Sequence, residues 1–246
     1  MRRAEGSALR SAFGPPPESR RRVRIARGVR DEILVLIDGR LASLTRPETL
    51  SALKTAGAPI VRQLCVALDA GSTEAKATAA WLLGAIGSRL AIPALARPIE
   101  GARWRGEAPV VLRRAAEALL RLGPPGIDAF DRAVRPLASD DLTRLLLIRH
   151  ASAELAAMSP RPRVNRRTLA GWARALETYL GRIERLAQVS EVDRQTFQRL
   201  VLEGYGVSIE EDRAIVPRLI DALKGYPVAG STTHDQRERT DRRDQA

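Results

Sequence analysis

Three stretches of the chain repeat one pattern of apolar residues around a glycine. Aligned on Gly57, Gly87 and Gly123, the stretches are 30 and 36 residues apart. Before and after each glycine, apolar residues recur every three or four positions, which places them on one face of an α-helix. Glycine suits the left-handed conformation at a helix C-terminus. Each stretch therefore predicts two short helices that meet at its glycine.

The predicted helices are too short to bury their apolar faces alone. Stacking neighbouring pairs buries a continuous core, as in an α-solenoid; an ordinary helical bundle is the alternative. Ser72, Ser190 and Ser208 are typical N-caps at helix starts. The predicted apolar stripes are Leu50 and Leu53, Ala79, Leu83 and Ile86, and Ala115, Leu119 and Leu122 for the first helices, and Ile60, Leu64 and Leu68, Ile92, Leu95 and Ile99, and Ile127, Phe130 and Val134 for the second.

Two segments carry the features of a known repeat. The segment "RRAAEALLRLG" (113–123) follows the first-helix pattern R-x-A-A-x-A-L-x-x-I-G, with Leu122 in place of isoleucine. The segment "GSRLAIPAL" (87–95) contains the second-helix pattern A-I-P-x-L. The chain therefore resembles HEAT-repeat proteins, of the short kind found in phycobilin lyases and many bacterial proteins. The resemblance covers residues 72–136 and, with fewer matches, 45–71.

This resemblance implies an all-α fold, a right-handed α-solenoid of short HEAT-like helix pairs with a C-terminal helical extension. The pattern returns in "EDRAIVPRLIDAL" (211–223), where Pro217 takes the register of Pro93. Both prolines are expected near the start of a second helix, because a missing N–H costs little there.

The activities of similar proteins set the range of functions that the resemblance implies. Phycobilin lyases attach a bilin to a partner's cysteine, but this chain has no bilin-site motif. Alkylpurine DNA glycosylases bind duplex DNA on a basic concave face, and their motifs are not recognised here. Deoxyhypusine hydroxylase binds iron through His-Glu pairs, whereas Ala151 follows His150 and Asp235 follows His234. Fold alone does not give function. Because the repeat pattern is regular and no catalytic constellation is recognised, we expect a non-enzymatic scaffold or accessory subunit that binds another protein. The alternatives are a DNA- or RNA-binding solenoid, including a glycosylase-like protein, and a bilin-lyase-related subunit.

Composition divides the chain into five parts. Residues 1–22 and 229–246 lack apolar periodicity, so we expect a disordered basic arm and a disordered tail. Between them the sequence predicts the α-solenoid over 23–157, a proline-containing linker over 158–165, and C-terminal helices over 166–228, the last of which resembles the repeat.

The segment 166–188 has the longest regular apolar stripe. Its apolar residues alternate by three and four, as in the a and d positions of a coiled coil. Such a seam would make a partner or homo-oligomer surface; the other interpretation is a face that packs on the preceding repeat. The stripe consists of Leu169, Trp172, Leu176, Tyr179, Ile183 and Leu186.

The candidate interaction site is an insertion between two repeats, "GARWRGEA" (101–108), which accounts for the longer spacing of 36 residues. Arg103, Trp104 and Arg105 combine an aromatic surface with two cations, so they could anchor a protein partner or grip and stack on nucleic acid. The alternative is that Trp104 folds back and covers the preceding helix.

No catalytic, cofactor or metal site is predicted. Metal sites need clustered histidine, cysteine or carboxylate ligands, and His150 has no second histidine nearby, so it is interpreted as a structural residue. A nucleophile needs an adjacent base, and Cys65 in "RQLCVAL" is interpreted as a buried, inert thiol. One cysteine cannot form an internal disulfide, no secretory signal is recognised, and no membrane span is expected, so the predicted location is cytoplasmic.

Charge leaves nucleic acid open as a partner. The formal net charge is +12, but residues 1–30 carry +7 of it, the tail 231–246 is neutral, and 31–230 carries +5. Arginine makes up 38 of the 41 basic residues, which is also what a GC-rich coding bias would produce. We therefore expect a protein partner first and a nucleic acid second.

Overall fold

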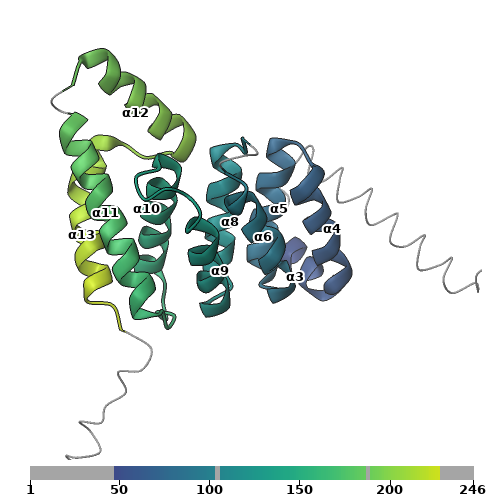
Figure 1. Ribbon diagram of the computed structural model, residues 1–246. Helices are drawn as coiled ribbons and strands as arrows, with labels where there is room; N and C mark the ends of the chain where they lie inside the picture. Colours follow the sequence, from purple (N-terminus) through teal and green to yellow (C-terminus); the bar gives the residue numbers. More distant parts are fainter. Residues whose placement is uncertain (1–46, 103–105, 187–188, 228–246) are drawn as a thin grey trace, which may run out of the picture.

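The computed structural model describes residues 47–102, 106–186 and 189–227, and in these ranges the chain is all-helical, with ten α-helices and no strand (Figure 1). This confirms the predicted fold class at the level of all-α. The helices are α3 (Pro47–Ala56), α4 (Ala58–Ala70), α5 (Thr73–Ile86), α6 (Ile92–Glu100), α8 (Pro109–Arg121), α9 (Pro124–Val134), α10 (Leu142–Ala157), α11 (Arg166–Leu186), α12 (Glu191–Tyr205) and α13 (Ile209–Lys224), with a short 3-10 helix η1 (Arg89–Ala91) before α6.

The helices stand side by side in an order that follows the chain, from α4 on one side of the molecule to α13 on the other (Figure 1). Helix α12 departs from this arrangement and lies at an angle near the upper ends of α10 and α11 in this view. The helices pack on helices that come shortly before or after them in the chain: α5 packs on α4 and α8, α6 on α8 and α9, and α10 on α8 and α11. Neighbouring helices thus share one core, as the apolar stripes require. The right-handed solenoid itself stays a prediction, and the terminal segments 1–22 and 229–246 lie outside the described residues, as do 23–46 of the predicted solenoid.

The three aligned glycines all have positive φ angles, at +65° for Gly57, +78° for Gly87 and +74° for Gly123. Only Gly87 has the left-handed helical conformation that the sequence predicts for all three. Gly57 and Gly123 have ψ angles of −144° and −157°, because the next helix begins at once with a proline in its first turn. After Gly87, the turn η1 intervenes before α6. Gly87 therefore acts as the expected C-cap, whereas Gly57 and Gly123 form tight turns between consecutive helices.

The predicted stripes form the core, in which almost all of their side chains are buried. Small residues let α5 and α8 approach closely: a Cβ atom on Gly84 would lie 2.8 Å from the Cα of Ala118. Ala79, Ala80, Ala115 and Ala116 are likewise buried. The close contact between α5 and α8 positions the candidate site described below.

The coiled-coil interpretation of 166–188 is not supported. Along α11, Leu169, Trp172, Leu176, Tyr179 and Ile183 are buried within this chain, where α11 packs on α10 and α13. The stripe therefore packs on the chain itself, as the alternative predicts. The expected position of Pro217 is also wrong: it lies inside α13 and not near the helix start, whereas Pro93 is in the first turn of α6.

A buried polar network joins three of the C-terminal helices. Asp212 of α13 is 0% exposed. Its Oδ1 accepts hydrogen bonds from Nε of Arg149 on α10, at 2.9 Å, and from Nη2 of the same residue. Its Oδ2 accepts from the hydroxyl of Tyr179 on α11 at 2.8 Å. Burial, followed by the charge of Asp212, raises the pKa of Tyr179, so the phenol stays a donor.

None of the described helices is both long enough and apolar enough to cross a membrane.

Candidate functional site

The predicted interaction residues Arg103, Trp104 and Arg105 lie outside the described residues, so this site stays a prediction. The residues that follow are described. Glu107 forms an ion pair with Lys76 of α5, with Nζ and Oε1 2.8 Å apart. This pair joins the segment before α8 to the first half of α5.

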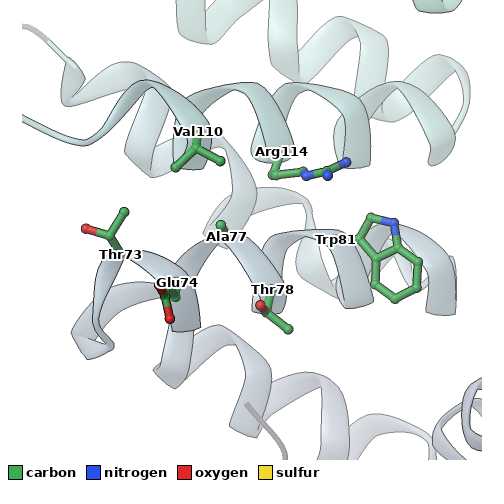
Figure 2. A pocket seen from close by; sticks show the side chains of 7 residues that line it. All are labelled: Thr73, Glu74, Ala77, Thr78, Trp81, Val110 and Arg114. Atoms are coloured by element: carbon green, nitrogen blue, oxygen red, sulfur yellow. The ribbon is translucent and has the colours of Figure 1, made fainter. Parts of the chain in front are cut away.

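A pocket of about 290 Å³ lies between α5 and α8 (Figure 2). Trp81 of α5 is half-buried, and its ring faces the pocket together with Val110 and the stem of Arg114 from α8. The full lining is Thr73, Glu74, Ala77, Thr78, Trp81, Val110 and Arg114. The surface of the pocket is mainly apolar, and its lining includes one acidic and one basic side chain.

Helical spacing brings these residues together. Thr73, Ala77 and Trp81 are four residues apart, as are Val110 and Arg114, so each set lies on one helix face. Ser72 fixes the start of α5, since its hydroxyl oxygen accepts the N–H of Ala75 at 3.2 Å. About one turn beyond Trp81, the missing side chain of Gly84 lets α5 approach α8 closely at Ala118.

Next to the pocket, Arg114 connects to a cluster of charged groups. Its Nη1 donates to Oε2 of Glu117 at 2.8 Å, and the other oxygen, Oε1, accepts a hydrogen bond from Nε2 of His150 on α10 at 2.8 Å. Arg113 approaches the same Oε1 with its Nε at 3.8 Å. Burial by itself would raise the pKa of Glu117, but the hydrogen bonds from His150 and Arg114 outweigh it and lower the pKa to about 2.

The ionised state of Glu117 contributes to stability. Because its pKa is lowered to about 2 in the folded protein, this contribution is present above the pKa of an ordinary glutamate and is lost as the pH falls toward 2. At neutral pH the carboxylate is therefore a fixed negative charge. An ionised carboxylate only accepts hydrogen bonds, so Nε2 of His150 carries the hydrogen.

Glu154 completes the cluster. It lies four residues after His150 on α10, and one ligand atom from each of Glu117, His150 and Glu154 lies within 4.8 Å of the others. This is the one group of three such side chains that the described residues bring together. The helical spacing of His150 and Glu154 is visible in the sequence, but Glu117 is 33 residues from His150. Only the packing of α8 against α10 brings it there.

Cys65 does not provide a nucleophile for this site. It lies on α4, which supplies no residue to the pocket or to the charged cluster. Its side chain is half-buried, whereas the sequence predicts a buried thiol. Burial, followed by the nearby carboxylate of Asp69, raises the pKa of Cys65. The thiol is therefore less reactive than a free cysteine.

A scan against protein-family models and searches of the curated proteins and of the solved structures found no match to this chain.

Proposed function

We propose that the chain is a non-enzymatic helical scaffold or accessory subunit, and that a protein partner docks on the face where α5 and α8 form the pocket. The observation that carries this proposal is the half-buried ring of Trp81, which lines an apolar pocket of about 290 Å³ together with Val110. Tryptophan and arginine dominate the energetics of protein interfaces. A partner side chain that enters the pocket would contact both Trp81 and Arg114.

The charges on this face favour a protein over a nucleic acid. Glu74 and Arg114, of opposite charge, both line the pocket. Arg114 is already paired with Glu117 at 2.8 Å. A phosphate backbone is bound by unpaired cations, whereas a mixed border around an apolar centre is the usual composition of a protein interface.

The test uses the substitution Trp81→Ala. Affinity purification of the full chain from its source cells identifies a co-purifying protein, and the purified pair is then measured by calorimetry. We expect Trp81→Ala to weaken the affinity by at least about thirtyfold, because losing a central aromatic anchor costs about 2 kcal/mol or more.

The matched control is Leu90→Ala, since Leu90 is an apolar side chain that is 66% exposed on η1, away from the pocket. We expect this variant to bind as the unmodified chain does. Unchanged affinity of a folded Trp81→Ala variant would contradict the proposal and direct attention to Arg103, Trp104 and Arg105.

Nucleic acid is the second candidate partner, and a different surface favours it. Arg161, Arg163, Arg166 and Arg167 are all exposed where the connection from α10 enters α11. The first turn of α11 contains no acidic residue, and the ion pairs among the described residues include none of these four arginines. We define these four residues as the arginine edge. Its charge and the positive end of α11 suit phosphate groups.

Salt dependence tests this second candidate. We expect fluorescence-labelled DNA or RNA to bind more weakly as salt increases, and the triple substitution Arg163→Ala, Arg166→Ala and Arg167→Ala to reduce the slope of log K against log salt by about 3 at most. The control is Arg199→Ala, Arg213→Ala and Arg218→Ala, three exposed arginines of α12 and α13. If both triple variants lose affinity for DNA or RNA equally, the binding depends on net charge and not on the arginine edge. If the unmodified chain binds no nucleic acid, this second candidate is excluded.

A further inference from the structure

We propose that Glu117, His150 and Glu154 form a binding site for a divalent transition-metal ion between α8 and α10, and that zinc is the ion that suits these ligands. His150 and Glu154 are one turn apart on α10, and Glu117 faces them from α8. Imidazole nitrogen and carboxylate oxygen are common zinc ligands. The inference does not depend on the proposed function.

The three ligand atoms are close enough to share one ion. They lie within 4.8 Å of one another, and zinc bonds of about 2.0–2.2 Å place tetrahedral ligand atoms about 3.4 Å apart. Binding therefore requires the side-chain torsions of the three ligands to close this difference. Helical spacing of four residues is also how one helix supplies two ligands to a single zinc ion in known metal motifs.

Binding the ion exchanges one hydrogen bond for metal bonds. The Nε2 of His150 gives up its 2.8 Å hydrogen bond to Oε1 of Glu117, and both atoms then coordinate the ion. The hydrogen of the neutral imidazole moves from Nε2 to Nδ1, so the ring keeps its charge state. Three protein ligands leave a fourth position for water, which is the arrangement of open zinc sites.

Arg114 is placed to orient the ligand from α8. Its Nη1 holds Oε2 of Glu117 at 2.8 Å, and so leaves Oε1 directed at His150. Outer hydrogen bonds of this kind commonly fix carboxylate ligands.

The two guanidinium groups limit the affinity. Arg113 and Arg114 lie 3.8 Å and 2.8 Å from the carboxylate oxygens of Glu117, so their two charges offset those of the two carboxylates. A divalent ion is then partly repelled. We expect the affinity to be well below that of structural zinc sites, which are built from thiolates and imidazoles.

The experiment is calorimetric titration of the chelator-treated full chain with Zn²⁺, together with thermal unfolding at increasing Zn²⁺. We expect one ion per chain and a rise in Tm, because an ion held by two helices binds only the folded state. Glu154→Gln and His150→Ala should each weaken binding by at least about tenfold. The half-exposed position of Glu154 keeps Glu154→Gln folded, so it decides the test if His150→Ala unfolds.

The matched control is His234→Ala, which removes the other histidine of the chain and should leave the titration unchanged. Absence of stoichiometric binding would overturn the proposal, as would Zn²⁺ binding that persists in Glu154→Gln. A loss caused by His234→Ala would place the ion elsewhere and overturn it too. Substitution by Co²⁺ adds an independent readout, since its visible spectrum should change in Glu154→Gln and not in His234→Ala.

Discussion

Replacing Asp212 by alanine should lower the free energy of unfolding by about 3–5 kcal/mol, because it leaves the charge of Arg149 buried without its partner. Asp212 is 0% exposed and Arg149 is 8% exposed. The substitution also removes the acceptor for the buried hydroxyl of Tyr179, which now lies 2.8 Å from Oδ2. A domain has only about 5–15 kcal/mol of stability in total, so this loss should lower Tm strongly.

The control for this prediction joins two of the same helices through an exposed ion pair. Glu177 of α11 lies 3.1 Å from Lys224 of α13, and the two side chains are 51% and 60% exposed. Glu177→Ala should cost about 1 kcal/mol or less. Urea unfolding followed by circular dichroism measures both variants. Similar losses for Asp212→Ala and Glu177→Ala would contradict the role given to the buried network.

Helix positions could be predicted from the sequence because they depend on local chemistry. The apolar stripes follow the helical period, and α3 and α5 end directly before Gly57 and Gly87. Two serine caps are confirmed: the hydroxyl oxygens of Ser72 and Ser190 each accept a backbone N–H at 3.2 Å. Ser208 precedes α13 as predicted, but its hydroxyl donates to Glu210 at 2.9 Å instead.

The pocket and the charged cluster could not be predicted, because they depend on which helices pack together. Trp81 is 33 residues from Arg114 in the sequence, and Glu117 is 33 residues from His150. Each pair joins two helices that pack together although another helix lies between them in the chain. Alignment of the glycines predicts where helices lie in the sequence, but not which helices pack together or where each side chain points.

Local patterns were also insufficient in the C-terminal part. The register of Pro217 matches that of Pro93, and yet Pro217 lies inside α13. The buried network that fixes α13 joins Arg149, Tyr179 and Asp212 across separations of 63 and 33 residues. The local signal of Pro217 does not set the helix start, because α13 begins at Ile209 and continues through this proline.

The second large effect is expected from Trp172→Ala, which should cost about 3–5 kcal/mol. Trp172 of α11 is 1% exposed. Its ring meets that of Phe130 on α9 edge to face, with the centroids 5.3 Å apart and the planes at 88°. Its Nε1 donates to Oδ1 of Asp131 at 3.1 Å. Alanine removes the ring that fills the space between α9 and α11 and leaves a cavity there.

Two further variants show why Trp172→Ala lowers stability. Equilibrium urea unfolding gives the free energy of unfolding of all three variants. Trp172→Phe keeps an aromatic ring but loses the N–H donor, while Asp131 retains its 2.6 Å bond from Arg135, so we expect about 1–3 kcal/mol. Trp81→Ala makes the same change as Trp172→Ala at a half-buried position, and should cost about 1–2 kcal/mol.

If Trp81→Ala destabilises as much as Trp172→Ala, Trp81 is a core residue, and its loss of partner binding would no longer support a docking site at α5 and α8. If the Trp81→Ala variant stays folded and no longer binds the partner, the roles of the two tryptophans follow their burial: Trp172 stabilises the fold, and Trp81 binds the partner.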